Sequence, residues 1–251
     1  MVLPLEQTMD SLTGKVAIVT GASGGIGHAI AERLAQEKAT VVVNYGKSAD
    51  KAKAIVTGIE SKGGKAVAMQ ADMSKVADAR RLVRDTVQRF GRLNILVNNA
   101  GITLQKPLVE TTEQEFDQIF DLNAKGPYFA MQEAAKVIED GGRIVNISSG
   151  GTQLGLPGAT AYMGTKGALE QFTKGLAHEL APRGVTVNTV SPGFTDTEML
   201  WDNFREAAVQ MTPLRRLGKP EDIADVVVFI VSNQARWLTG QNIQASGGLV
   251  M

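Results

Sequence analysis

A tyrosine and a lysine, Tyr162 and Lys166, stand four residues apart in a stretch with helical periodicity. Residues with this spacing lie on one face of an α-helix, so both side chains can act on one small molecule. A free phenol has a pKa near ~10, and a neighbouring ammonium favours the phenolate. Such a tyrosine can protonate the alkoxide that forms when hydride reaches a carbonyl carbon. On spacing alone, an ordinary pair on a helix surface is the better interpretation.

A glycine-rich turn, Thr20-Gly21-Ala22-Ser23-Gly24-Gly25-Ile26-Gly27, joins the first apolar run to the first helical stretch. Glycines at such a turn let backbone N–H groups approach phosphate oxygens, and the helix N-terminus adds a favourable dipole. A merely tight turn is the alternative, and the strand before and helix after disfavour it. The residues predicted to contact a dinucleotide here are Gly21, Ser23, Gly25, Ile26 and Gly27.

The end of the second strand indicates which dinucleotide fits. NAD enzymes usually place Asp or Glu here to bind the ribose 2′-hydroxyl, and none occurs before Asp50. A carboxylate would repel the 2′-phosphate of NADP, whereas Asn44, Lys47 and Ser48 can donate to it. We therefore predict NADP(H) in preference to NAD(H), although a solvated loop lysine is the ordinary interpretation of Lys47.

The strands and helices that could position these groups are predicted from the spacing of apolar residues along the chain. Short β-branched runs alternate with longer amphipathic stretches, which is typical of βαβ units, and most runs are apolar on both faces. The pattern predicts a Rossmann-type, doubly wound α/β fold with a seven-stranded, mainly parallel sheet and helices on both faces. The predicted strands are 16–20, 40–44, 66–70, 95–98, 144–148, 185–190 and 242–244, and the predicted helices are 25–37, 49–62, 76–90, 113–139, 161–181 and 220–232.

Length and composition limit the classes of function. The chain has 251 residues, no cysteine, two histidines and a formal net charge of zero. One domain, residues 1–251, is expected, and neither nucleic acid, a membrane surface nor a protein-bound metal is favoured as partner. The segment 1–14 shows neither a signal peptide nor an apolar span, which favours the cytoplasm. The loop-rich stretch 192–219, with a short helix expected around 198–208, suits a lid over a ligand.

Four motifs occur in an order that resembles the compact members of the short-chain dehydrogenase/reductase family. They are the glycine turn 20–27, then Asn98-Asn99-Ala100-Gly101, then Ile147-Ser148-Ser149, then the segment 162–166. The resemblance covers nearly the whole chain. It implies an NADP(H)-dependent carbonyl reductase or alcohol dehydrogenase, and its relatives commonly form homotetramers.

The resemblance also assigns roles near the reacting carbon. Tyr162 is implied as the general acid and base, and Lys166 as the residue that lowers its pKa and binds the nicotinamide ribose. Ser149 is implied to hydrogen-bond the substrate oxygen, with Ser148 as the neighbouring alternative. Asn123 matches the asparagine that holds a water in a proton relay, and an asparagine inside a helix suits a local kink.

Further positions match the family's cofactor contacts. Asn99 and Gly101 correspond to the segment that lines the adenosine ribose. Asp72, followed by Met73, resembles the residue that binds the adenine amino group, and a helix cap is the equally favoured alternative. The turn that contacts the nicotinamide carboxamide and the pyrophosphate corresponds to Pro192, Gly193 and Thr197.

Three positions depart from the family pattern. Position 24 is glycine where many NADP-preferring relatives have a basic residue, Ser246 replaces a frequent Asp, and Thr195 replaces an aliphatic residue. The sequence does not assign a role to Thr195 or Ser246.

Several substrates remain open, among them a 3-oxoacyl thioester on a carrier protein, a ketone or diketone, a sugar and a steroid-like ring. A carrier-protein substrate predicts a basic patch, for which Arg205, Arg215, Arg216 and Lys219 are candidates. Met199, Trp201 and Phe204 either wall an apolar pocket or clamp the lid onto the core. A protein that binds the dinucleotide without turnover is the alternative from another class.

Overall fold

Seven strands form one sheet in the order β3-β2-β1-β4-β5-β6-β7, and every ladder in it is parallel. The computed structural model describes residues 11–251, so most of the N-terminal segment on which we based the absence of a signal peptide lies outside the described residues. Chain order reverses between β1 and β4, where a doubly wound sheet binds its ligands. The strands are β1 (Val16–Val19), β2 (Thr40–Tyr45), β3 (Lys65–Gln70), β4 (Leu93–Asn98), β5 (Ile138–Ile147), β6 (Thr186–Pro192) and β7 (Asn242–Ala245).

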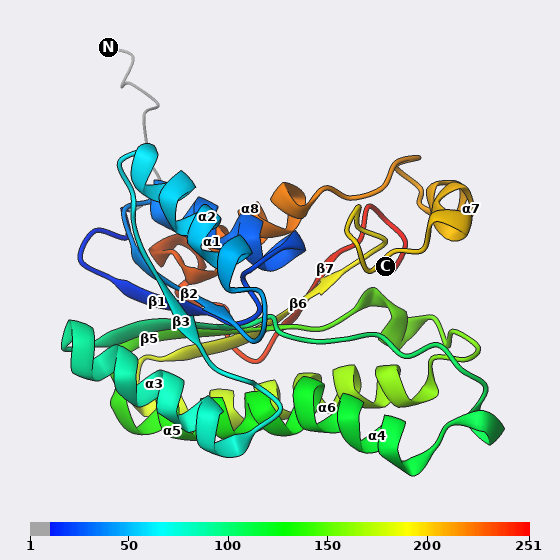
Figure 1. Cartoon of the computed structure of the whole chain (residues 1–251), viewed down its shortest axis with the longest axis horizontal. Coiled ribbons are helices and arrows are strands. Elements are labelled where there is room, and N and C mark those ends of the chain that lie inside the picture. Colours follow the sequence, from blue (N-terminus) through cyan, green and yellow to red (C-terminus); the bar gives the residue numbers. More distant parts are fainter. Residues whose placement is uncertain (1–10) are drawn as a thin grey trace.

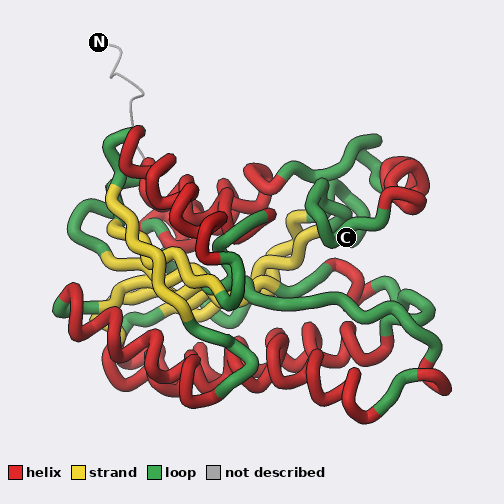
Figure 2. Tube along the Cα trace, in the orientation of Figure 1, coloured by secondary structure: helices red, strands yellow, loops and turns green. Residues whose placement is uncertain are grey.

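Helices cover both faces of the sheet, which confirms the predicted fold class (Figure 1). One layer contains α1 (Gly25–Gln36), α2 (Ala49–Ser61) and α8 (Pro220–Val231), and the other contains α3 (Val76–Phe90), α4 (Glu113–Phe120), α5 (Gly126–Val137) and α6 (Thr160–Leu180). The short helix α7 (Arg205–Met211) stands apart from both, at the end of the long loop that follows β6 (Figure 2). Within residues 11–251, no helix combines the length and apolar character needed to cross a bilayer.

Two apolar cores result from alternation along the strands. In β1, Ala17 and Val19 face the core under α1 and α8, whereas Ile18 faces the core under α3 and α5, and all three are fully buried. A strand that buries both faces is a near-continuous apolar run. This explains why the strands could be predicted from period alone.

The long helix predicted over 113–139 is interrupted. A π-helical turn, Asp121–Lys125, separates α4 from α5, and the N–H of Gly126 donates to the carbonyl of Asp121. Such single-turn insertions occur often at functional sites. The turn contains Asn123, where we expected a local irregularity of the helix.

Gly126 follows the π-helical turn at a point where the chain has no space for a side chain. A Cβ at this position would lie 1.8 Å from the carbonyl oxygen and 2.9 Å from the carbonyl carbon of Met73. Both atoms belong to the backbone, so a rotamer change cannot relieve the clash. We expect Gly126→Ala to lower the free energy of unfolding by about 3 kcal/mol or more, measured by urea denaturation.

Gly175→Ala is the matched control, because Gly175 is exposed on α6 and a Cβ there meets nothing within 4 Å. Alanine is the better helix former, so this variant should gain about 0.5–1 kcal/mol. Equal stability of the Gly126→Ala variant and the wild type would show that the loop before α3 and the π-helical turn do not approach as described.

Candidate active site

The glycine turn between β1 and α1, residues 20–27, exposes its backbone to a ligand, and we call it the glycine cradle. Gly21 and Gly25 have φ of 62° and 53°, a region that glycine adopts without the steric cost of a side chain. A Cβ at Gly27 would lie 2.4 Å from the Asn99 amide nitrogen and 2.6 Å from the Gly21 carbonyl oxygen. No side chain of the described residues caps α1, and its first turn carries no acidic residue. An uncapped helix N-terminus with an open glycine turn fits a dinucleotide pyrophosphate.

The side chains of the residues that immediately follow β1 and β4, Thr20 and Asn99, hold this cradle in place. The Asn99 amide donates to the carbonyls of Thr20 (2.9 Å) and Gly21 (3.2 Å). The Thr20 hydroxyl in turn accepts from the backbone N–H groups of Asn99 (2.9 Å) and Ala100 (3.0 Å). Ser23 and Ile26 are half-buried in the same turn. The structure thus joins two of the predicted motifs by hydrogen bonds between adjacent strands.

Asn44 does not have the predicted geometry. Its side chain is buried, and its amide donates to the carbonyls of Met69 and Ala71 (both 3.2 Å), while its Oδ1 accepts from Gly21 N–H (3.2 Å). The prediction that Asn44 donates to a 2′-phosphate is therefore wrong, because its polar atoms already brace the glycine turn. Lys47 and Ser48 are exposed, and the Ser48 hydroxyl does not cap α2 among the described residues. These two side chains remain as the candidate 2′-phosphate contacts.

Asp72 lies in the loop after β3 and closes a local turn. Its Oδ1 accepts from the hydroxyl (2.7 Å) and the backbone N–H (3.1 Å) of Ser74, which lowers the pKa of the Asp72 carboxyl. The N-cap of α3 is Lys75, so the helix-cap alternative for Asp72 is wrong. The Met73 side chain is buried, so a ligand at this place would meet its backbone.

Asn123, Gly101 and Lys166 come together from the π-helical turn, the end of β4 and α6. The Asn123 amide donates to the Ile102 carbonyl (2.8 Å) and the Thr165 hydroxyl (3.2 Å), and its Oδ1 accepts from Ile102 N–H (2.9 Å). A Cβ at Gly101 would lie 3.2 Å from Asn123 Oδ1 and 3.5 Å from Lys166 Nζ. Gly101 thus lets the asparagine and the lysine approach the same point.

Ser149 and Ser148 are distinguished by their hydrogen bonds. The Ser148 hydroxyl is buried and donates to Glu170 Oε1 (2.8 Å), with the Lys166 carbonyl 3.2 Å away. The Ser149 hydroxyl accepts from Gly151 N–H (3.2 Å) and interacts with the Tyr162 phenol. Of the two alternatives, the geometry favours Ser149 as the serine that faces the tyrosine.

Tyr162 and Lys166 lie on one face of α6, with Lys166 Nζ 5.7 Å from the centre of the Tyr162 ring. The lysine is buried and donates to the Ile147 carbonyl (2.9 Å), and burial lowers its pKa to about 8. Burial raises the pKa of Tyr162, and the contact with Ser149 opposes this rise. In this structure the effect of burial on the Tyr162 pKa is thus opposite to the lowering that we expected from Lys166.

The turn after β6 packs against the turn after β7. A Cβ at Gly193, which follows Pro192, would lie 2.8 Å from Ser246 Cα, so the two turns touch through backbone. The Ser246 hydroxyl accepts from Val250 N–H (3.1 Å) and thus ties down the C-terminal turn. The Thr195 hydroxyl donates to the Gly193 carbonyl (3.0 Å). Both departures from the family pattern thus make local hydrogen bonds.

The segment 192–219 carries a 3₁₀ turn, Asp202–Phe204, followed by α7, slightly later than the helix predicted at 198–208. Phe204 packs edge-to-face on Phe194, with ring centres 5.2 Å apart, and so holds the segment together. Trp201 is 45% exposed and contributes to a cleft of about 490 Å³ with Thr103, Leu104, Gln105 and Asn203. The tryptophan therefore lines a cleft, whereas the contact of Phe204 with Phe194 lies within the segment itself.

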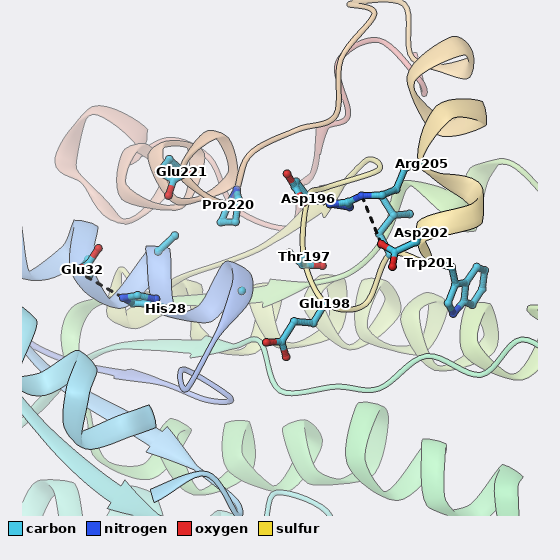
Figure 3. A pocket seen from close by; sticks show the side chains of 13 residues that line it. His28, Glu32, Asp196, Thr197, Glu198, Trp201, Asp202, Arg205, Pro220 and Glu221 are labelled. Carbon is cyan, nitrogen blue, oxygen red and sulfur yellow. Dashed lines mark hydrogen bonds and ion pairs between the residues drawn. The ribbon is translucent and has the colours of Figure 1, made fainter. Parts of the chain in front are cut away.

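A second cleft of about 780 Å³ lies between α1, the segment 192–219 and the start of α8. Gly25 and Thr197 meet in it, with a Cβ at Gly25 falling 3.5 Å from Thr197 Cγ2. Figure 3 shows His28 and Glu32 on one side, and Arg205 beside Asp196 and Asp202 on the other. This cleft therefore adjoins the glycine cradle.

Several contacts were not predicted from the sequence. Thr165, between the tyrosine and the lysine, links Asn123 to the Tyr162 carbonyl (2.7 Å), and its place inside that motif was the available signal. In the sequence, Thr20 stood out only as the first residue of the glycine turn, and its hydrogen bonds to the segment after β4 were not predicted.

Among residues 11–251, no group of three or more His, Asp or Glu side chains is placed to hold a metal ion.

Comparisons with known proteins agree with this geometry. The family model described as "Enoyl-(Acyl carrier protein) reductase" matches residues 21–250. An uncharacterized oxidoreductase of Methylorubrum extorquens is 49% identical, over 96% of this chain and all of that protein. A 3-oxoacyl-[acyl-carrier-protein] reductase of Staphylococcus epidermidis is 41% identical, over 94% and 99%. The solved structure of an angucycline C-6 ketoreductase with bound NADP has a TM-score of 0.92 and 42% identity, over 96% and 97%.

Proposed function

The chain belongs to the short-chain dehydrogenase/reductase family, and we propose that it transfers a hydride between NADP(H) and a carbonyl or secondary alcohol carbon. The observation that carries the proposal is the meeting of Tyr162, Ser149 and Lys166 beside Gly101 and Asn123. The nicotinamide, when bound, supplies or accepts the hydride. The glycine cradle and the exposed Lys47 and Ser48 would hold this dinucleotide.

Proton transfer falls to Tyr162. Because burial raises its pKa, the phenol keeps its proton at neutral pH and can donate it to an alkoxide. The Ser149 hydroxyl donates to the same substrate oxygen as charge develops on it. Lys166, held by the Ile147 carbonyl, places a positive charge beside the phenol and stabilises the phenolate once the proton has left. Reduction therefore starts with the phenol protonated.

Lys47 is the basis of the proposed preference for NADP(H), which is also supported by the NADP bound to the ketoreductase structure. We expect Lys47→Ala to weaken NADPH binding by about 10-fold, the usual worth of one hydrogen bond to a charged group. NADH, which lacks the 2′-phosphate, should bind as before. Dissociation constants from fluorescence titration measure both effects.

Lys53→Ala is the control for this substitution, because Lys53 is exposed and lies six residues further along the chain, in α2. It should leave both dissociation constants unchanged. An equal loss of affinity for NADPH and NADH in the Lys47→Ala variant would place the residue away from the 2′-phosphate and remove the main support for this cofactor preference.

For the substrate we propose a ketone that is not attached to a carrier protein. Two of the four candidate basic residues are paired with acids, since Arg205 pairs with Asp196 and Arg216 pairs with Asp222. A 3-oxoacyl-carrier-protein substrate is the second candidate, favoured by the similarity to the Staphylococcus epidermidis reductase. Trp201 and Leu104 give the nearby cleft an apolar wall suited to either.

The proposal is tested by following NADPH oxidation with ketones, diketones and one 3-oxoacyl group presented both as a small thioester and on a carrier protein. Turnover of free ketones, and equal kcat/KM for both forms of the thioester, is the expected result. A much higher kcat/KM for the carrier-bound form would favour the second candidate. A protein that binds NADPH but reduces no carbonyl in the panel would oppose the proposed activity.

A further inference from the structure

Glu170 occupies a position on α6 that the proposed reaction leaves unexplained. Tyr162, Lys166 and Glu170 follow one another at intervals of four residues, so the carboxylate continues the stripe that carries the acid and its lysine. Glu170 is half-buried, and its side chain is directed to the loop after β5 rather than to a basic residue.

Two hydroxyl groups from that loop converge on one oxygen of Glu170. The Ser148 and Thr152 hydroxyls both donate to Oε1, each at 2.8 Å. Ser148 immediately precedes Ser149, and Thr152 lies in the 3₁₀ turn Gly150–Gln153 that immediately follows it. The carboxylate therefore fastens the chain on both sides of Ser149 to the helix that carries Tyr162.

Ser149 itself depends on this short segment for its orientation. Its hydroxyl accepts from Gly151 N–H (3.2 Å), and its carbonyl lies 3.0 Å from the Thr152 hydroxyl. Hydrogen bonds to a carboxylate are shorter and stronger than those to a neutral acceptor. Without Glu170, the Ser148 and Thr152 hydroxyls would retain only the backbone carbonyls of Lys166 and Ser149 as partners, and both of these belong to the elements to be aligned.

From these contacts we infer that Glu170 is a positioning residue, which fixes the Ser149 hydroxyl relative to the Tyr162 phenol by binding the hydroxyls of Ser148 and Thr152. The inference rests on the proposed function, because it assigns Ser149 to the substrate oxygen. Glu170 itself touches neither the reacting atoms nor the dinucleotide cradle.

The test is a double-mutant cycle on carbonyl reduction. Glu170→Ala should lower kcat by about 10-fold and leave the NADPH dissociation constant unchanged, because it removes two charge-assisted hydrogen bonds near Ser149 only. Glu170→Gln keeps an acceptor oxygen and should restore most of the activity. If Glu170 acts through Ser149, adding Glu170→Ala to a Ser149→Ala variant should lower kcat hardly any further. The same loss in both backgrounds would overturn the inference.

Thr152 gives a second route that does not alter the carboxylate. Thr152→Val removes one of the two hydroxyls at nearly constant volume and should lower kcat in the same way, whereas Thr152→Ser should not. Equal kcat values for Thr152→Val and the wild type would remove one of the two contacts on which the inference depends.

Amide hydrogen exchange separates this inference from the proposed activity. Peptides that cover residues 148–153 should exchange faster in Glu170→Ala than in the wild type and Glu170→Gln, and this needs no substrate. A wild type without carbonyl reductase activity would refute the proposed function, while the exchange would still report whether Glu170 holds the segment. Unchanged exchange in Glu170→Ala would overturn the inference whatever the activity.

Discussion

Replacing Tyr162 with phenylalanine should lower kcat for carbonyl reduction by about 10²- to 10⁴-fold, the usual contribution of a positioned general acid. The Tyr162 phenol interacts with Ser149, and its ring lies close to the buried Lys166 ammonium. Phenylalanine removes only the hydroxyl. The glycine cradle, which lies on the other side of Gly101, is not altered. NADPH affinity should therefore stay within about twofold of the wild type, since the variant loses transition-state stabilisation rather than cofactor binding.

Tyr128→Phe is the matched control, because Tyr128 is 45% exposed on α5 and packs against Phe172 through its ring. Its kcat should equal that of the wild type. Full activity in Tyr162→Phe would refute the assignment of the acid. A wild type that binds NADPH without turning over any carbonyl would instead support the alternative of a dinucleotide-binding protein without catalysis.

The second large effect is expected at Lys166. Methionine fills a similar volume without the charge, so Lys166→Met should lower kcat by about 10²-fold or more, because no ammonium remains to stabilise the Tyr162 phenolate. Lys174→Met, at an exposed position of the same helix, should keep the wild-type rate. Steady-state rates with NADPH and a ketone measure both. Wild-type activity in Lys166→Met would show that the charge is not used.

The same substitution should also change how stability depends on pH. Burial lowers the pKa of Lys166 to about 8, whereas a lysine in the unfolded chain titrates near ~10.4. Between these values the unfolded state holds more protons than the folded state, so the free energy of unfolding rises with pH; below about pH 8 this contribution is constant. The rise should amount to about 1.5 kcal/mol between about pH 8 and about pH 9.5, and be absent in Lys166→Met. Urea denaturation at both pH values would measure it.

Some elements were readily predicted from the sequence, for a physical reason. Strands buried on both faces are continuous β-branched runs, so β1, β2 and β6 appear in the sequence without any knowledge of their neighbours. The glycine turn was equally easy to recognise in the sequence, because so many glycines close together usually mark a place where the backbone must approach another group closely. These are local signals.

What the sequence could not supply were contacts between distant segments. Asn44 lies near the end of β2, as a ligand-binding residue often does, yet the carbonyls of Met69 and Ala71, brought alongside by β3, accept hydrogen bonds from its amide. The pKa of Tyr162 was expected to be lowered by Lys166, but the desolvation that raises it depends on burial, which spacing along one helix does not reveal. Each error arose where the tertiary environment decides the property.

We propose that hydride passes directly between the nicotinamide and a carbonyl carbon. NADPH carrying two deuterium atoms at C4 of the nicotinamide should be incubated with the wild type and a ketone that it reduces, and the alcohol analysed by mass spectrometry and NMR. We expect one deuterium per product molecule, bound to the new carbinol carbon, and almost no product with Tyr162→Phe. Deuterium at another carbon, or an alcohol without deuterium, would show that the hydride does not pass directly from the nicotinamide to the carbonyl carbon.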